Sequence, residues 1–379
     1  MGKRVFFIAG EKSGDVHAAE VIRRLKELWP DVEIAFWGGS AMAEAVGSQP
    51  LVHIRELATI GFWEVVRKLP HFVRLWHRVQ RDIASFRPEL LVLVDFPGFN
   101  MRVANWAKRR GYSVHYYIAP KAWAWNRRRV YTMAECIDRL YVILPFEEDF
   151  FKSYGIRAQY VGNPVMERYL KALHQGGIRP FEERDDDALL LLPGSRLSEV
   201  RHILPVMIKA AQRAGRRRVT VSRVKEIPID VYHRALESAG GGEYEIVDRD
   251  IAELLSTHRH GWVASGTATL EAALWDVVQI VLYRVHPITY FVAKRIARVS
   301  YVSLVNLILQ TPLVPELLQD QMCVKELLKQ WERIHRPEEI RRIRQGYADL
   351  RHRLGERYPS REVAIALAEA LNKGGGHTT

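Results

Sequence analysis

The sequence predicts an α/β fold made of two Rossmann-like domains, each with a parallel sheet. Three observations carry this prediction. Short continuous apolar runs alternate with helix-like stretches, as in βαβ units whose strands are buried on both faces. The alternation weakens at residues 163–187 and then begins again. The length of 379 residues is too great for one ordinary core and suits two domains of about 180 residues each.

The apolar runs locate the strands. The predicted strands of the first half are residues 4–8, 90–94, 114–118 and 140–144. Those of the second half are residues 188–192, 219–221, 261–264 and 277–282. An amphipathic helix is predicted at residues 16–29. The expected parts are a first domain at 1–170, a linker at 171–187, a second domain at 188–335 and C-terminal helices at 336–379. The sequence leaves open whether those helices pack back on the first domain.

The charge balance points to an anionic partner. The chain has 56 Lys and Arg against 44 Asp and Glu, a formal net charge of +12, which favours nucleic acid, phospholipid headgroups or a phosphorylated substrate. Cys136 and Cys323 are too far apart for a cysteine-based zinc site and favour a reducing compartment. We expect no signal peptide and no transmembrane helix, because the first apolar run is short and the longest uncharged stretch, residues 299–315, is too polar.

Polar side chains follow two predicted strands of the first half. Glu11, Ser13 and Asp15 come after the first strand in a segment bracketed by glycines, where open α/β sheets bind ligands. The glycine spacing does not match a dinucleotide-binding motif, so a nicotinamide cofactor is not supported. Asp95 follows the strand at 90–94, where partial burial would raise its pKa towards that of a general base. A structural explanation remains open, with Asp15 and Asp95 as helix caps.

Aromatic and basic residues are interleaved at 119–129. Trp123 and Trp125 precede three consecutive arginines that end at Arg129. Aromatic faces stack on sugars and Arg binds phosphate, so Trp125 and Arg129 are candidates for substrate binding. The same residues would suit a nucleic-acid patch, or one buried tryptophan beside a solvated helix start.

Two loops of the second half share a layout of small residues between a strand and a helix. Both are candidates for holding a diphosphate through backbone N–H groups, and a carboxylate in the second could accept the hydroxyls of a ribose. The residues concerned are Gly194, Ser195, Arg196, Gly266, Thr267 and Glu271. The alternative is a structural cap with Glu271 as its capping-box partner. The Asp-x-Asp pattern at 248–250 is interpreted as a loop and helix start, and we expect no metal there.

Large apolar and basic residues alternate at 61–81. A basic amphipathic helix with aromatic residues is typical of a segment that lies in a membrane interface. The apolar candidates are Phe62, Trp63, Val66, Leu69, Phe72 and Trp76. A helix that packs on the protein core is the competing interpretation.

Seven motifs occur in order along the chain: AGEKSGD at 9–15, VDFP at 94–97, WAW at 123–125, LPFE at 144–147, LPGSR at 192–196, SGTATLE at 265–271 and YVSLVNL at 301–307. Together they resemble the lipid-A-disaccharide synthase family (glycosyltransferase family 19). The resemblance implies a GT-B fold with the active site in the cleft between two Rossmann-like domains. It implies an inverting, metal-independent transfer without a cofactor, from UDP-2,3-diacylglucosamine to 2,3-diacylglucosamine 1-phosphate (lipid X). The products are the β-1,6 disaccharide phosphate and UDP.

The resemblance also assigns roles to residues. Asp95 would be the base, and Arg196, Glu271 and Asn306 would contact the nucleotide. Glu11, Ser13 and Asp15 would line the acceptor side in the first domain, which would also meet the membrane. Many members carry a second Asp where this chain has Gly98, which leaves Asp95 as the one carboxylate of its loop.

The implied location is the cytoplasmic face of the inner membrane, as a peripheral protein on the lipid surface. A homodimer through the C-terminal helices is compatible with the sequence. Other enzymes of the same fold, a UDP-sugar epimerase or the glucosaminyltransferase of peptidoglycan synthesis, are alternatives. A basic nucleic-acid-binding protein is an alternative from another class, but we expect no nucleic acid as partner because no recognised motif occurs.

Overall fold

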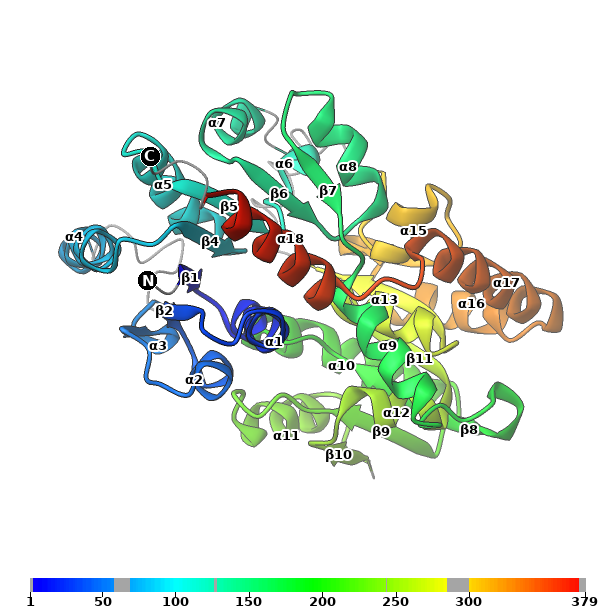
Figure 1. Cartoon of the computed structure of the whole chain (residues 1–379). Coiled ribbons are helices and arrows are strands. Elements are labelled where there is room, and N and C mark those ends of the chain that lie inside the picture. The colour runs from blue at the N-terminus through cyan, green and yellow to red at the C-terminus, as the bar shows by residue number, and fades with distance from the viewer. Residues whose placement is uncertain (1–2, 58–68, 126–127, 243, 285–299, 375–379) are drawn as a thin grey trace, which may run out of the picture. The chain divides into compact units, whose positions relative to one another are not determined.

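The computed structural model describes residues 3–57, 69–125, 128–242, 244–284 and 300–374 (Figure 1). The chain divides into two compact units. Unit 1 comprises Met1–Pro164 and Arg357–Thr379, and unit 2 comprises Val165–Glu356. The first boundary thus falls before the segment 171–187 that we expected to be the linker. That segment holds the end of α9 (Pro164–His174) and the start of β8 (Asp185–Leu192). Its Gly, Pro and Asp residues mark a surface loop inside unit 2.

Unit 1 contains a seven-stranded sheet in the order β3-β2-β1-β4-β5-β6-β7, and all of its strand pairs are parallel. Its strands are β1 (Arg4–Ala9), β2 (Glu33–Gly38), β3 (Val52–His53), β4 (Leu90–Val94), β5 (Ser113–Tyr117), β6 (Arg139–Val142) and β7 (Ala158–Tyr160). Its helices are α1 (Lys12–Leu28), α2 (Ser40–Val46), α3 (Ile54–Leu57), α4 (Leu69–Phe86), α5 (Pro97–Lys108), α6 (Ala122–Trp125), α7 (Arg128–Cys136), α8 (Pro145–Lys152) and α18 (Pro359–Gly374). The four strands predicted for the first half are confirmed to within two residues.

Unit 2 contains a six-stranded sheet in the order β10-β9-β8-β11-β12-β13, again with parallel pairs. Its other strands are β9 (Arg218–Ser222), β10 (Glu245–Val247), β11 (His258–Ala264), β12 (Val278–Tyr283) and β13 (Glu316–Leu318). Its helices besides α9 are η1 (Phe181–Glu183), α10 (Leu197–Arg213), α11 (Ile229–Ser238), α12 (Ile251–Thr257), α13 (Thr267–Leu274), α15 (Leu304–Leu309), η2 (Gln319–Gln321), α16 (Val324–Ile334) and α17 (Pro337–Leu354). The predicted α/β class with two Rossmann-like parallel sheets is confirmed.

The C-terminal helices belong to different units. α17 packs in unit 2, where the buried hydroxyl of Tyr347 donates to the backbone oxygen of Val277. α18, red in Figure 1, lies along α1, and its buried Val363, Ala364 and Leu367 complete the same core as β1 and α1 of unit 1. The 336–379 segment is therefore not one structural part, because its second helix alone carries the apolar side chains that the first core needs.

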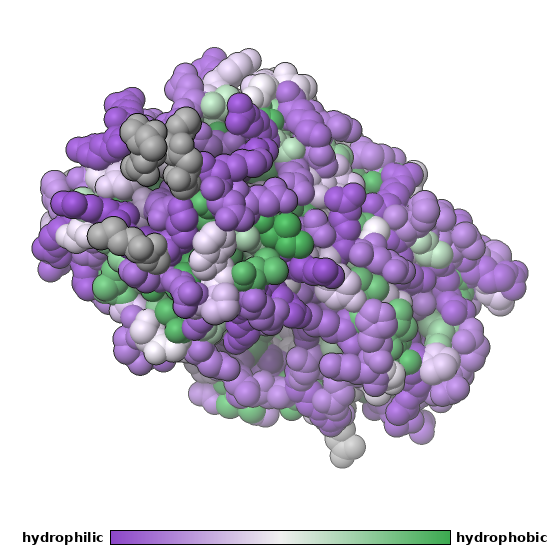
Figure 2. Space-filling model, in the orientation of Figure 1, coloured by the Kyte–Doolittle hydropathy of each residue, from purple (hydrophilic) through white to green (hydrophobic). Residues whose placement is uncertain are grey.

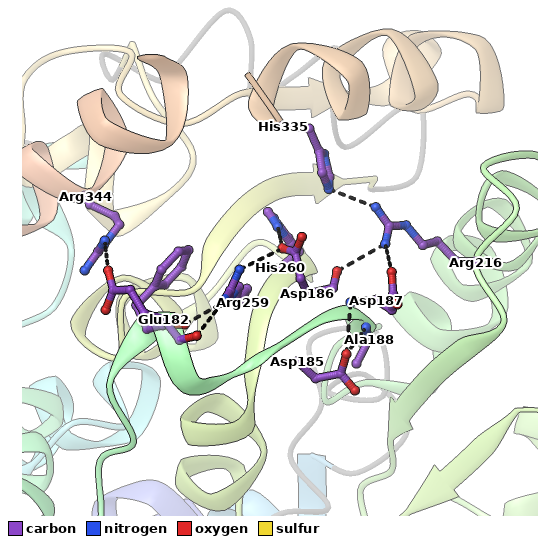
Figure 3. Close-up of polar contacts among 11 residues, drawn as sticks. Glu182, Asp185, Asp186, Asp187, Ala188, Arg216, Arg259, His260, His335 and Arg344 are labelled. Atoms are coloured by element: carbon purple, nitrogen blue, oxygen red, sulfur yellow. Dashed lines mark hydrogen bonds and ion pairs between the residues drawn. The ribbon is translucent and has the colours of Figure 1, made fainter. Parts of the chain in front are cut away.

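A network of polar side chains lies at the amino ends of β8 and β11 (Figure 3), and we call it the amino-edge cluster. Its members are Asp185, Asp186, Asp187, Arg216, Arg259, His260 and His335. The Nε2 atom of buried His260 lies 3.2 Å from a carboxylate oxygen of Asp186, and its ring stacks on His335 with a centroid distance of 4.2 Å. Arg216 reaches the Nε2 of His335 at 3.1 Å. These side chains mostly bond one another at the edge of the sheet.

Candidate active site

Each sheet has one point where the strand order reverses. In unit 1 the chain leaves β1 towards β2 on one side, and β4 lies on the other side. In unit 2 the equivalent neighbours are β8 and β11. Ligands of open α/β sheets bind outside the carboxyl ends of the strands at this point. Glu11 and Asp95 follow β1 and β4, and the loops at 194–196 and 265–266 follow β8 and β11. The sequence candidates therefore flank the reversal point of their own sheet.

The backbone at Asp95 is held in an unusual conformation. Asp95 and Phe96 have φ angles of 47° and 50°, in the left-handed region that non-glycine residues adopt rarely. The hydroxyl of Tyr116 donates to the backbone oxygen of Asp95 at 2.6 Å, and the side-chain amide of Asn100 donates to it at 2.8 Å. The N–H of Asp95 donates to the oxygen of Tyr117 at 2.9 Å, as the next rung of the sheet. These bonds hold the backbone from which the Asp95 side chain projects.

The surroundings of the Asp95 carboxyl group raise its pKa above the ordinary value of an aspartate. Burial raises its pKa, and the negative charge of Glu11 raises it further. The backbone N–H of Phe96 and the charge of Lys121 lower it, with a net pKa of about 6. A carboxyl group with this pKa is ionised near neutral pH and yet basic enough to accept a proton from a hydroxyl in a transition state.

Position 10, directly before Glu11, has no room for a side chain. A Cβ atom on Gly10 would lie 2.2 Å from the ring of Phe96, so any larger residue would displace the turn that carries Asp95. α1 begins at Lys12, four residues before the predicted helix, so exposed Ser13 lies in its first turn and not in a loop. The segment between β1 and α1 is only Gly10 and Glu11, and this places Glu11, which is exposed, directly at the sheet edge.

Asp15 is engaged inside unit 1. It is 3% exposed, and its carboxylate accepts hydrogen bonds from the backbone N–H groups of Gly39, Ala41 and Met42 at 2.6, 3.0 and 3.2 Å. These groups surround the start of α2, so Asp15 caps α2, and not α1 as the structural alternative supposed. We expected Asp15 to contact the acceptor, but its carboxylate is buried and bonded to the backbone at the start of α2.

The aromatic segment is anchored by the last residue of the LPFE motif, for which no role was predicted. Glu147 is buried and accepts hydrogen bonds from the indole N–H of Trp123 at 2.8 Å and from the backbone N–H of Leu144 at 3.0 Å. Burial raises the pKa of Glu147 to about 7 against these hydrogen bonds, which lower it. Trp123 is therefore the buried tryptophan of the pair. Trp125 ends α6, its side chain is outside the described part of the chain, and half-buried Arg129 interacts electrostatically with Tyr116.

The loop after β8 does not present all of its backbone N–H groups to solvent. A carboxylate oxygen of Glu199 accepts from the N–H groups of Ser195 and Arg196 at 3.0 and 3.2 Å. Gly194 has a φ of 109°, and a Cβ there would lie 2.4 Å from the same oxygen. Glu199 therefore already occupies two of the backbone N–H groups that we expected to bind a diphosphate. The Arg196 side chain is 80% exposed and bonds Glu199 at 3.1 Å, which leaves guanidinium N–H groups directed to solvent.

The loop after β11 is tied to the segment before α15. Ser265 donates through its hydroxyl to the oxygen of Val302 at 2.8 Å, while Gly266 and Thr267 are exposed at the start of α13. Asn306 is buried, and its carboxamide bonds both backbone groups of Val314 and the carboxylate of Glu316. The polar atoms of Asn306 that we assigned to a nucleotide are therefore occupied within unit 2.

Glu316 lies outside all of the motifs. Its carboxylate accepts from the N–H groups of Val302 and Ser303, from the hydroxyl of Ser303 and from the side chain of Asn306. These bonds fix the 302–306 segment on the first residue of β13, while Ser265 ties the same segment to the loop after β11. The sequence offers no local signal for this role, because the partners lie 10 to 14 residues away in the chain.

Glu271 projects from the second turn of α13 and does not act as a capping-box partner. Its carboxylate Oε1 bonds Arg168 of α9 at 2.9 Å, and its side chain is 13% exposed. Arg168 also bonds Asp250, which caps α12 by accepting from the N–H of Ala252 at 2.7 Å. The interpretation of residues 248–250 as a loop and helix start is confirmed. Asp248 pairs with Arg223 at 3.3 Å.

Comparison with known proteins gives the family. The family described as lipid-A-disaccharide synthetase matches residues 5–367. A lipid-A-disaccharide synthase of Myxococcus xanthus is 37% identical over 380 residues, which cover 98% of this chain and 98% of that protein. One of Geobacter sulfurreducens is 32% identical with the same coverage. The chain belongs to the lipid-A-disaccharide synthase family. The resemblance found from the motifs is confirmed.

Membership of the lipid-A-disaccharide synthase family makes the chain a glycosyltransferase of lipid A synthesis that uses a UDP-sugar and a lipid substrate. The fold agrees with this assignment. A solved UDP-GlcNAc 2-epimerase of Neisseria meningitidis, bound to UDP-GlcNAc, matches with a TM-score of 0.66 over 97% of this chain and 100% of that chain. The identity of 11% limits that likeness to the GT-B fold.

The proposed membrane segment of this lipid-A-disaccharide synthase family member is only partly described. Phe62, Trp63 and Val66 lie outside the described residues, as does the side chain of Leu69. Phe72 and Trp76 of α4 are half-buried, and each contacts the ring of Phe99 of α5 edge to face, at 5.9 and 6.5 Å. Both rings therefore contribute to the packing of unit 1, as the competing interpretation expected.

No helix in the described ranges is long and apolar enough to cross a bilayer. Figure 2 shows hydrophilic residues over most of the face that it draws, with hydrophobic residues in smaller groups between them. Among the large apolar side chains of α4, Val73 is 43% exposed.

Proposed function

We propose that the chain joins UDP-2,3-diacylglucosamine to 2,3-diacylglucosamine 1-phosphate, with Asp95 of unit 1 as the base and unit 2 as the nucleotide-binding part. The observation that carries this proposal is the Asp95 carboxyl group. It lies at the reversal point of its sheet, on a strained and hydrogen-bonded turn, and burial raises its pKa to about 6.

The proposed step is a single displacement with inversion. Asp95 takes the proton of the acceptor 6-hydroxyl while that oxygen forms a bond to the anomeric carbon of the donor. The bond between this carbon and the diphosphate oxygen breaks, and UDP leaves with the electron pair. Glu11 and Lys121 set the charge around the base. Ser13, Trp125 and Arg129 are proposed to contact the acceptor.

Unit 2 is proposed to hold the nucleotide through side chains more than through backbone N–H groups. Since Glu199 occupies the N–H groups of Ser195 and Arg196, the exposed guanidinium of Arg196 is the stronger candidate for the diphosphate. Gly266 and Thr267 at the start of α13 are candidates for the second phosphate contact. Glu271 is proposed to accept the ribose hydroxyls.

Turnover and binding of Asp95 variants test the function. With the two acylated substrates, the full chain is expected to give a disaccharide phosphate and free UDP, detected by mass spectrometry. Asp95→Asn is expected to lower turnover by at least about 10²- to 10⁴-fold, the usual contribution of a general base, while the affinity for UDP stays the same.

Asp149→Asn, which changes an exposed carboxylate of α8, is the matched control and is expected to behave like the wild type. Near-normal turnover of Asp95→Asn would exclude Asp95 as the base. Absence of any product from acylated substrates, with product from soluble acceptors, would favour another enzyme of this fold.

We also propose that unit 1 meets the cytoplasmic surface of the inner membrane. The acyl chains of the proposed substrates and the basic residues around α4 support this location. Because Phe72 and Trp76 pack on Phe99, the apolar contact is assigned chiefly to Phe62, Trp63 and Val66.

Flotation with anionic liposomes tests the membrane proposal. Changing Phe62, Trp63 and Val66 together to Ser is expected to reduce the floated fraction, and a thermal melt checks that the variant is folded. If flotation were unchanged, these residues would not form the membrane contact.

A homodimer through α17 and α18 stays a prediction, which light scattering of the purified chain tests.

A further inference from the structure

The bond between Arg168 and Glu271 joins two segments that are 103 residues apart in the sequence. Arg168 lies in the second turn of α9, the first helix after the boundary between the units at Pro164 and Val165. One of its terminal nitrogens bonds Oε1 of Glu271, and the other bonds Asp250 at the start of α12. A single guanidinium thereby links α9, α12 and α13.

The contacts of Glu271 leave half of its carboxylate available. In the part of the chain that the structure describes, Arg168 is the hydrogen-bond partner of Oε1, and Oε2 has none. A carboxylate has about four acceptor positions, so one Arg contact leaves room for the two hydroxyls of a ribose. The arginine holds the group by one oxygen and leaves the other oriented for a ligand.

We propose that Arg168 is a positioning residue, which fixes the Glu271 carboxylate in the orientation that receives the ribose diol of the nucleotide. This inference rests on the proposed function, in which unit 2 binds UDP. It adds a residue outside every motif, reached only through its contact with Glu271.

The electrostatics of the site agree with this role. Burial raises the pKa of Glu271, Arg168 lowers it, and the nearby charge of Asp250 raises it again. If a neutral residue replaced Arg168, burial and Asp250 would still raise the pKa of Glu271, and no positive charge would oppose them. Glu271 would then be protonated more readily and would lose its fixed direction, and a neutral carboxyl group accepts hydrogen bonds more weakly.

The test compares UDP with 2′-deoxy-UDP by titration calorimetry on the full chain. The ratio of the two dissociation constants isolates the ribose contact, because both probes share the diphosphate and its ionisation. We expect a ratio of about 10- to 100-fold for the wild type, as for hydrogen bonds to a charged group. Glu271→Gln is expected to reduce the ratio to within about threefold of unity.

Arg168→Met and Arg168→Gln are expected to reduce the ratio like Glu271→Gln near neutral pH. In these variants the part of the loss that comes from protonation of Glu271 is expected to be recovered as the pH is raised. Arg168→Lys, which keeps the charge, is expected to retain most of the discrimination. Arg249→Gln is the matched control, since Arg249 is an exposed neighbour that pairs with Glu245 and Glu253.

The outcomes separate this inference from the function on which it rests. If the wild type does not bind UDP, the proposed function of unit 2 fails. If the wild type discriminates, Glu271→Gln does not, and both neutral variants of Arg168 keep the full ratio, only the role of Arg168 is overturned. A purely structural ion pair would lower the unfolding midpoint of these variants and leave the ratio and its pH dependence unchanged.

Discussion

The two ends of the sheet in unit 2 are both polar, and they differ in what the polar groups bond. At the amino ends of β8 and β11, His260 is fully buried against Asp186, and Arg216 and Arg259 complete the amino-edge cluster. At the carboxyl ends of the same strands, the Arg196 side chain is 80% exposed and Glu271 keeps an oxygen without a partner among the described residues. A cluster of polar residues alone therefore does not indicate a binding site. Whether the cluster lies at the carboxyl ends or the amino ends of the strands must be known as well.

Apart from that of Asp95→Asn, the largest expected effect comes from the carboxyl edge of unit 1. In Gly10→Ala the new Cβ would meet the ring of Phe96 at 2.2 Å, so the turn that carries Asp95 must shift. A displacement of about 1 Å can lower turnover by about 10²-fold, and we expect a loss of this size with little loss of folding. Steady-state kinetics and a thermal melt measure both.

Gly98→Ala is the control for Gly10→Ala, because a Cβ on Gly98 in α5 would meet nothing within 4 Å. It is expected to keep wild-type turnover. Equal losses in the two variants would show that the turn at Phe96 has no special role in catalysis.

The pH dependence of the reaction sharpens the same comparison. Asp95 must be ionised to accept a proton, and its pKa is about 6. The value of kcat/KM is therefore expected to fall about tenfold per pH unit below this pKa. Glu11→Gln removes a like charge and so lowers the pKa of Asp95, which moves the acid limb to lower pH. A limb that moves to higher pH, or not at all, would contradict the interaction between these two carboxyl groups.

The amino-edge cluster is expected to affect stability and not turnover. Burial lowers the pKa of His260, and the neighbouring His335 lowers it further. The unfolded chain then takes up a proton below about pH 6.5 that the folded chain does not bind. The stabilising contribution of neutral His260 is thus complete above that pH and is lost as the pH falls.

His260→Phe keeps an aromatic ring against His335 and Trp331 and removes the titrating group. We expect it to lower the free energy of unfolding by about 1 kcal/mol at high pH, through the lost bond to Asp186, and to flatten the decline in acid. Urea unfolding across the pH range measures this. Turnover near neutral pH should stay within about twofold, and a folded variant without activity would assign the amino edge a part in the reaction.

An effect similar in size to that of His260→Phe is expected at the loop after β8. Glu199→Ala removes the acceptor of two backbone N–H groups and is expected to lower the free energy of unfolding by about 0.5–2 kcal/mol, as for other helix caps. Glu199→Gln keeps an acceptor of similar shape and should cost less. Denaturant midpoints of the two variants give the comparison, and equal midpoints for Ala and the wild type would argue against a capping role.

The part of the fold that the sequence predicted is the part with continuous apolar runs. The run Leu90–Val94 could be assigned as a buried strand without other information, and Asp95 follows from it as a residue at the sheet edge. The strands β7, β10 and β13 have three residues each, too few for a pattern. β2 was also missed, although its residues 34–37 form a continuous apolar run behind exposed Glu33.

The site was predictable where it depends on strand ends and not where it depends on distant pairs. The positions of Asp95 and of the two loops of unit 2 follow from the parallel topology. The contacts of Glu271 with Arg168 and of Asn306 with Glu316 arise from tertiary packing, and no local residue spacing in the sequence predicts them. Asp15 illustrates the limit: its position suggested a ligand or a cap of α1, and folding placed its carboxylate on α2.

The place of α18 in the first core has a consequence for synthesis on the ribosome. Unit 2 is continuous in the chain, from Val165 to Glu356, whereas unit 1 needs a helix that is translated after the whole of unit 2. Val363, Ala364 and Leu367 cover apolar side chains of α1 that would otherwise face water. The nascent N-terminal half thus remains incomplete, with part of its interior uncovered, until α18 has been translated.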